Sequence, residues 1–260
     1  MCAFLGRLGA MAAEVVSSNI VGYEKINLAV GYNMVGPQFK LVGADTTERD
    51  IASIGTLEST MAGYGADYVF ANIMEVWDPA TKGYIQYGWS GTSGTDVDDD
   101  PSYDNQWLDS GLEKTEDTIA LGNGAWIKAA TAGSITIAGE VPTAATTTVQ
   151  LSTGYNIVAN PYPGEVAVAS FGALSSSMAG YGSDYVFATI MEVWDPETKG
   201  YTQYGWSGTS GTDVDDDSSY DNQWLDSGLE KTTDTIPFGT AVWIKAASEG
   251  SITFTSPVAE

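Results

Sequence analysis

Residues 67–89 read DYVFANIMEVWDPATKGYIQYGW, and residues 184–206 read DYVFATIMEVWDPETKGYTQYGW. Apolar residues alternate along the first stretch, as at Val69, Ala71 and Ile73, and this period of two is typical of a half-buried strand. The central WDPATKG supplies Pro79 and Gly83, residue types that fix or permit the backbone angles of a tight turn. The pattern therefore predicts a hairpin that joins residues 67–76 to residues 84–89, with Gly83 at positive φ.

The hairpin belongs to a longer internal repeat. A shift of 117 residues places residues 61–119 on residues 178–236 with six differences, and an upstream GYNMV at residue 31 matches GYNIV at residue 154. All eight tryptophans lie in the repeats, so each copy has its own large core-forming side chains and is expected to fold as a domain. We expect β-sandwich repeats at 14–139 and 140–260. Residues 1–13, with the small-x-small run Ala10-Met11-Ala12, are a signal-peptide remnant or an N-terminal extension.

The fold class follows from the spacing of the strands. About seven short strands per copy, separated by Gly, Pro, Asn and Asp, are typical of an antiparallel sandwich. Further strands are expected at 118–121, 125–129 and 134–137, and the only helical candidate lies around Thr56 to Met61 and in its twin. The sequence therefore predicts an all-β chain of two tandem antiparallel, Ig-like β-sandwich domains that arose by internal duplication.

The order of these motifs resembles a known kind of module. GYNMV is followed by VWD and GYxxYGW, then by GNGAWIKA and GSITI. This order is similar to that of tandem β-sandwich modules in large secreted bacterial surface proteins. The resemblance covers nearly all of both copies, although Tyr32 and Tyr155 stand where such modules usually have Trp, and Gly239-Thr240-Ala241 has lost one glycine. It implies a structural or adhesive scaffold and no catalytic residues.

Composition excludes several classes of function. The chain has 10 Lys and Arg against 34 Asp and Glu, a formal net charge of -24, so it should repel nucleic acid. It has no histidine, which removes the usual general base and the commonest zinc ligand, and we expect no enzyme activity. The single cysteine, Cys2, cannot form an internal disulfide framework. No segment approaches the ~20 apolar residues of a membrane helix, so no membrane span is expected.

An acidic loop in each copy is a candidate calcium site. Alternate carboxylates in a loop can converge on one hard cation, and Ca2+ prefers six to eight oxygen ligands. The alternative is a solvated acidic loop without a metal. The candidate ligands are Asp96, Asp98, Asp100, Asp104 and Asn105 in the first copy, and Asp213, Asp215, Asp217, Asp221 and Asn222 in the second.

Aromatic rings near these loops are candidate glycan contacts. Exposed rings form sugar-binding faces, but strand alternation turns about half of such rings inward, and the tryptophans are as readily explained as core anchors with bonded N–H groups. The rings of this possible platform are Tyr84, Tyr87, Trp89 and Trp107, with their counterparts Tyr201, Tyr204, Trp206 and Trp224.

The ends of the chain suggest self-association. Residues 257–260 align with residues 140–143 by the same shift of 117, so subunits could join head to tail across the kind of junction that links the two copies internally. A heterologous contact of this kind grows into an open fibre when its rotation does not close. An edge strand at 15–21 could complete the preceding subunit, and the alternative is a loose tail. The candidate interface residues are Val15, Val16, Ile20, Val21, Pro257 and Val258.

These observations predict an extracellular or cell-surface protein. The leading function is a structural subunit of a filament or surface array that binds itself, with calcium stiffening its acidic loops. The alternative is a carbohydrate-binding or adhesive module whose partners are surface glycans.

Overall fold

The computed structural model describes residues 20–43, 46–63, 70–92, 100–178, 180, 187–209 and 218–257. All its strand pairs are antiparallel. Within these ranges the only helical pieces are short 3-10 turns, including η1 (Ile51–Ser53), η3 (Pro101–Tyr103), η4 (Val168–Ser170) and η6 (Ser218–Tyr220). The expected all-β class with antiparallel sheets is therefore confirmed. The described segments contain no helix long and apolar enough to cross a bilayer.

The strands of the first repeat bond only to one another within the named sheets. They form a five-stranded sheet in the order β2-β9-β5-β6-β7, a three-stranded sheet β1-β10-β4 and a short pair β3-β8. Their bounds are β1 (Val21–Leu28), β2 (Gly31–Val35), β3 (Glu48–Asp50), β4 (Thr56–Leu57), β5 (Ile73–Asp78), β6 (Gly83–Trp89), β7 (Trp107–Leu108), β8 (Thr118–Ala120), β9 (Ala125–Ala129) and β10 (Gly133–Glu140).

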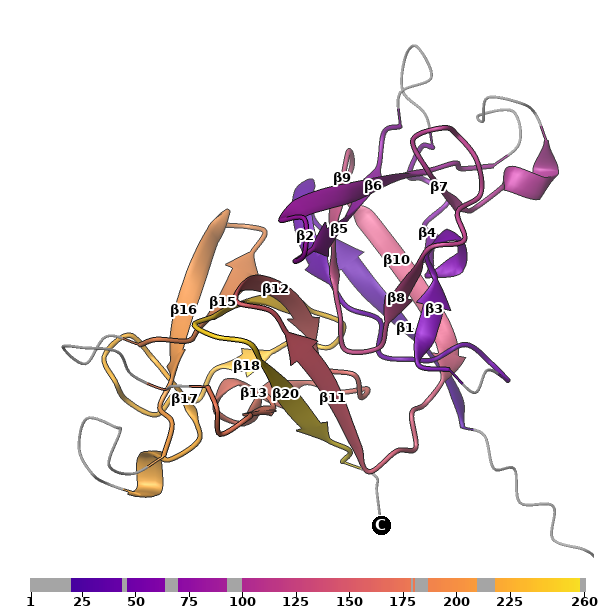
Figure 1. Cartoon of the computed structure of the whole chain (residues 1–260). Coiled ribbons are helices and arrows are strands. Elements are labelled where there is room, and N and C mark those ends of the chain that lie inside the picture. The colour runs from indigo at the N-terminus through magenta and orange to yellow at the C-terminus, as the bar shows by residue number, and fades with distance from the viewer. Residues whose placement is uncertain are drawn as a thin grey trace, which may run out of the picture.

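The second repeat has the same plan, and Figure 1 shows it as a separate half of the molecule, coloured dark red to yellow. Its sheets run β12-β19-β15-β16-β17, β11-β20-β14 and β13-β18. Their bounds are β11 (Thr146–Leu151), β12 (Gly154–Ala159), β13 (Val166–Ala167), β14 (Ala173–Leu174), β15 (Ile190–Asp195), β16 (Gly200–Trp206), β17 (Trp224–Leu225), β18 (Thr235–Ile236), β19 (Ala241–Ala246) and β20 (Gly250–Thr255).

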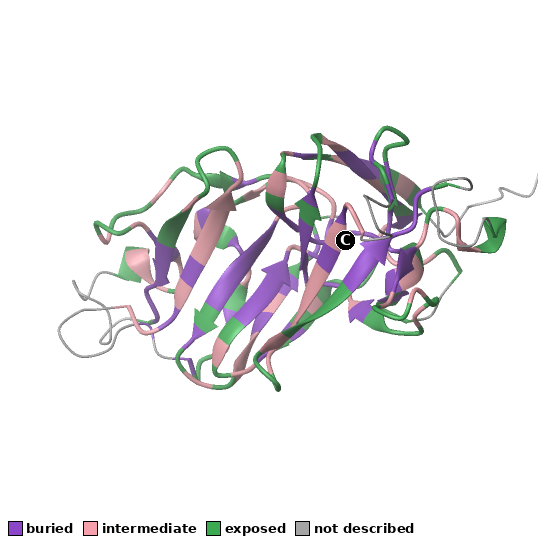
Figure 2. Cartoon of the chain, turned by 90° about the horizontal axis from the view of Figure 1, so that it is seen from above, coloured by how far each residue is buried: buried purple, intermediate pink, exposed green. Residues whose placement is uncertain are grey.

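Each repeat has its own hydrophobic core between its larger and smaller sheets. In the first repeat Met74, Trp89 and Ile127 from the five-stranded sheet pack with Ile135 and Ile137 from β10. The second repeat has an equivalent cluster. Buried and exposed positions alternate along strands of the smaller sheets such as β1 and β11, whereas β9, β12 and β19 of the larger sheets carry runs of buried residues (Figure 2). One face of each five-stranded sheet is thus committed to its own core, and the opposite face remains for other contacts.

The GYN motif fixes the corner that leads into each five-stranded sheet. The buried amide of Asn33 accepts a hydrogen bond from the N–H of Ala29 at 2.9 Å, and it donates to the carbonyl oxygens of Ala29, Gly31 and Ile127 at 2.9, 3.0 and 3.3 Å. Asn156 does the same in the second repeat. The side chain satisfies main-chain groups that the corner would otherwise leave without partners.

Two local expectations are wrong. The segment expected to be helical, around Thr56 to Met61, begins with β4, because Thr56 and Leu57 pair with β10. In the hairpin, Lys82 rather than Gly83 has positive φ, at 55°. The carboxylate of Asp78 stabilises this turn by accepting hydrogen bonds from the N–H of Ala80 and the hydroxyl of Thr81.

A candidate binding groove at the junction of the repeats

The outer faces of the two five-stranded sheets carry most of the aromatic residues that the cores do not use. Strand register sets this face: Trp77 lies opposite Tyr84, and Glu75 lies opposite both Gln86 and Trp126. Directly opposed residues project to the same side of a sheet. These side chains therefore share the side away from the core, and the same holds for their counterparts in the second repeat.

The two outer faces pack against each other, and we call this contact the seam. Its buried cluster combines residues of both repeats: Met34, Trp126, Ile157, Ala159, Ala241 and Trp243, with Trp77 and Trp194 packed against it. Edge-to-face ring contacts cross the seam between Trp77 and Trp243 and between Trp126 and Trp194, with ring centroids 5.5 Å apart in both pairs. Such geometry is favourable for aromatic pairs beyond the area that they bury.

The seam has approximate twofold symmetry. The indole N–H of Trp77 donates to the carbonyl oxygen of Tyr155 at 2.7 Å, and that of Trp194 donates to the carbonyl oxygen of Tyr32 at 2.7 Å. The main chain repeats the symmetry, because Gly36 donates to Gly239 at 2.9 Å and Ala159 donates to Gly122 at 2.8 Å. Equivalent residues thus exchange equivalent contacts, which defines an isologous interface.

A groove of about 290 Å³ opens along the seam. It is lined by Trp77, Tyr84, Tyr155, Glu192, Tyr201 and Trp243. The exposed fractions of Tyr84 and Tyr201 are 44% and 46%. Each of these two rings also contacts the indole of its own hairpin, with centroids 5.1 Å apart for Trp77 and Tyr84 and 5.0 Å apart for Trp194 and Tyr201. The indoles therefore hold the two exposed rings in place.

Polar groups accompany the rings on both sides of the groove. Gln86 donates to the carboxylate of Glu75 at 2.8 Å, and Gln203 donates to that of Glu192 at 2.7 Å. Partial burial raises the pKa of both Tyr84 and Tyr201, and side-chain hydrogen bonds with Trp126 and Trp243 respectively oppose that rise. The phenols thus stay neutral at physiological pH and can donate or accept hydrogen bonds.

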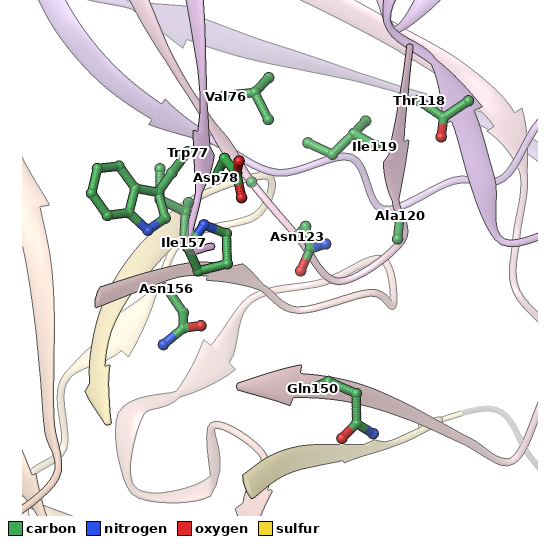
Figure 3. A pocket seen from close by; sticks show the side chains of 12 residues that line it. Val76, Trp77, Asp78, Thr118, Ile119, Ala120, Asn123, Gln150, Asn156 and Ile157 are labelled. Atoms are coloured by element: carbon green, nitrogen blue, oxygen red, sulfur yellow. The ribbon is translucent and has the colours of Figure 1, made fainter. Parts of the chain in front are cut away.

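Two clefts flank the groove at symmetric places on the seam. The first, of about 250 Å³, lies where Trp77 and Asp78 face Asn123 and Ile157 (Figure 3). Its counterpart, of about 650 Å³, includes Trp194 and Asp195. The larger cleft also contains Phe238, which packs on the core of the first repeat. Both clefts mix amide and carboxylate groups with apolar walls.

The structure divides the predicted glycan platform. Tyr84 and Tyr201 lie exposed in the groove, whereas the other six rings are buried in the cores and cannot contact a ligand: Tyr87, Trp89, Trp107, Tyr204, Trp206 and Trp224. For the tryptophans the explanation as core anchors holds, since the indole N–H groups of Trp107 and Trp224 donate to main-chain carbonyls. The hydroxyl of Tyr87 likewise has a fixed partner, since it donates to the carboxylate of Asp117 at 2.6 Å.

The predicted calcium ligands fall partly outside the described residues. Asp96, Asp98, Asp213, Asp215 and Asp217 lie there. Of the others, Asp100 accepts a hydrogen bond from the N–H of Ser102 and so caps η3, and Asn105 and Asn222 have positive φ. Asp104 and Asp221 lie in the turns that follow η3 and η6. Among the residues that the structure describes, no three His, Cys, Asp or Glu side chains form a metal-binding group.

The predicted end-to-end interface lies only partly within the described residues and stays a prediction. Val15, Val16 and Val258 lie outside the described residues. Val21 belongs to β1 and pairs with Glu140 of its own repeat, and the carbonyl of Ile20 accepts a hydrogen bond from the N–H of Val141. Pro257 is exposed. The internal junction joins the outer faces of the two five-stranded sheets.

Sequence reasoning missed most of the groove. Tyr32, Tyr155 and the indoles of Trp77, Trp126, Trp194 and Trp243 were recognised only as parts of motifs. Alternation gives part of the signal, since it places Trp77, Tyr84 and Glu75 on the parity opposite to core residues Met74 and Tyr87, but it does not say which parity faces the core. Comparisons with protein-family models, curated proteins and solved structures found no match.

Proposed function

We propose that the chain is a non-enzymatic, extracellular or cell-surface binding module of two tandem Ig-like sandwich domains, and that its groove binds a surface glycan. The observation that carries this proposal is the row of half-exposed rings, Tyr84, Tyr201 and Tyr155, held on two rigid sheets across the seam. Ligand sites combine aromatic walls with a few fixed polar groups. Sugar rings present apolar C–H faces and rims of hydroxyl groups, which suit the rings and the Glu–Gln pairs respectively.

Replacing either exposed ring should weaken glycan binding. We expect Tyr84→Ala and Tyr201→Ala each to lower affinity by about fivefold or more, because truncation of a central aromatic anchor typically costs more than about 1 kcal/mol. A glycan array identifies the ligand, and titration calorimetry then measures the change. The matched control is Tyr23→Ala, which removes a tyrosine that is 75% exposed on β1, outside the groove. Equal losses in all three variants would refute a site in the groove.

A second candidate function is the structural subunit of a filament, and the edge of β1 favours it. β1 bonds to β10 on one side only within the named sheets, and Ile20, Val21 and Tyr23 are exposed beside it. An open edge strand of this kind can accept a strand from a second subunit. The edge would then supply the growing contact, since the seam is already occupied inside each molecule.

Electron microscopy of the purified protein tests this second candidate. Filaments that disappear in Val21→Lys and Tyr23→Lys variants, but persist in Ile85→Lys on β6, are the expected result, because lysine on an edge strand opposes strand addition. Monodisperse particles at all concentrations would count against the filament.

The proposed calcium sites have their own readout. A cation that binds only the folded protein raises its melting temperature, so calcium should stabilise the wild type more than the Asp98→Asn and Asp215→Asn variants. An unchanged melting temperature on adding calcium would leave the acidic loops as solvated segments without a metal.

A further inference from the structure

At two places in the seam, a residue of one repeat faces its own counterpart in the other. Gly36 follows GYNMV and Ala159 follows GYNIV, so they occupy the same position of the repeat. Gly124 and Ala241 likewise precede the matching segments AWIKA and VWIKA. In both pairs the first repeat has glycine and the second has alanine. The two pairs lie close to the approximate twofold axis, because only there can equivalent positions meet.

Glycine is needed at these two positions because of the side chains that face them, not because of the backbone conformation. Neither Gly36 nor Gly124 is among the residues with positive φ. A Cβ atom built on Gly36 would overlap the methyl group of Ala159, and one on Gly124 would overlap that of Ala241 and lie 2.8 Å from a methyl group of Ile157. Alanine at the same backbone position is accepted in the second repeat. The absent methyl groups therefore make room for the opposite face.

The three possible pairings of these faces are not equivalent. A first-repeat face on a second-repeat face gives the observed fit. Two second-repeat faces would place two methyl groups in the same space at both positions, and overpacking of this kind is destabilising. Two first-repeat faces would leave small voids and lose contacts. The other seam residues differ little, since Trp77 and Trp126 match Trp194 and Trp243, and Met34 matches Ile157 in volume.

We propose that Gly36 and Gly124 make the seam a heterotypic recognition surface, whose partner is the second-repeat face of this chain or of a second copy. Two second-repeat faces cannot pack on each other, because their methyl groups would overlap. If copies exchange repeats, the first repeat of one copy can then pack only on the second repeat of another copy. The copies would therefore be arranged head to tail. This inference does not rest on glycan binding, because it concerns only how repeats select one another. It assigns to two glycine positions a specificity that the other residues of the buried seam cluster, which differ little between the repeats, cannot supply.

Small-angle scattering of full-length variants tests the proposal. In Gly36→Ala/Gly124→Ala both faces carry methyl groups, so the repeats should separate, with a larger radius of gyration and a red shift of tryptophan emission as the seam indoles meet water. Adding Ala159→Gly and Ala241→Gly moves the glycines to the second repeat and should restore the compact form. Gly83→Ala is the control, since a Cβ there meets only the Thr81 hydroxyl at 3.6 Å.

A mixing experiment tests recognition between copies. Gly36→Ala/Gly124→Ala blocks the first-repeat face and frees a native second-repeat face, whereas Ala159→Val/Ala241→Val blocks the second-repeat face and frees a native first-repeat face. The mixture should form a one-to-one heterodimer in size-exclusion chromatography, and the first variant alone should stay monomeric. The proposal is overturned if the double-alanine variant stays compact, if the four-substitution swap fails to restore compactness, or if the mixture does not pair.

Discussion

Trp107→Ala should lower the free energy of unfolding of the first repeat by about 3–5 kcal/mol, the range for removing a fully buried tryptophan. Trp107 has no exposed surface, packs on Trp89 with ring centroids 5.3 Å apart, and donates its indole N–H to the carbonyl of Gly55 at 3.2 Å. The substitution creates a cavity and also leaves a buried carbonyl without its donor. Urea unfolding followed by circular dichroism measures the change as a lower midpoint.

A series at the same position separates the two contributions. Trp107→Phe keeps much of the ring but loses the N–H, and it should therefore lie between alanine and the wild type. Ile85→Ala, at a side chain that is 48% exposed on β6, is the surface control and should change stability by less than about 0.5 kcal/mol. Trp224→Ala should reproduce the effect in the second repeat, where its indole donates to Phe171 at 2.9 Å. A midpoint unchanged by Trp107→Ala would contradict the core described here.

The strands were predictable because their signals are local. Alternation and turn residues located the hairpin of β5 and β6 and gave the bounds of β9, because strand parity and turn chemistry depend on near neighbours. The short strand at Thr56 was missed for the opposite reason. Two residues carry no period, and their strand conformation depends on pairing with β10, almost eighty residues away in sequence. Local propensity cannot report such a long-range pairing.

The groove was harder to predict than the strands, because its walls come from two repeats. Alternation separates Tyr84 from Tyr87, but it does not say which parity faces the core. Each repeat contains both rings that are buried in its core and rings that line the groove. Only the packing of the two outer faces against each other shows which rings belong to the groove. The role of Gly36 likewise cannot be predicted from the first repeat alone, because it depends on the methyl group of Ala159 that faces it from the second repeat.

A buried carboxylate distinguishes the two repeats chemically. Glu24 on β1 points inward, and within the described structure neither of its oxygens has a hydrogen-bond partner. The guanidinium of Arg49 lies near, but its NH groups donate to the carbonyls of Phe39, Ala138 and Ile54. Burial raises the pKa of Glu24 to about 8, and the nearby charge of Arg49 opposes that rise only in part. Thr147 occupies the matching position of the second repeat, so it has no such group there.

The first repeat should therefore lose stability as the pH rises from about 4.5 to 8. The folded state holds the Glu24 proton more tightly than the unfolded chain, whose pKa is near 4.5. The stabilisation is thus complete below pH 4.5 and falls by about 1.4 kcal/mol per unit until the pH passes the folded pKa, for a loss of up to about 5 kcal/mol. Glu24→Gln keeps the shape and removes the titration, so its stability should vary less over this range.

Urea midpoints measured at pH 5, 7 and 9 for both proteins isolate the contribution of Glu24, because the remaining charges of a chain with net charge -24 are common to both. Glu249→Gln, at an exposed bend before β20, is the control and should follow the wild type at every pH. Parallel pH profiles for wild type and Glu24→Gln would mean that the carboxyl does not titrate in its buried position. A profile that flattens only in Glu24→Gln would assign the loss of stability to the charging of this one buried side chain on β1.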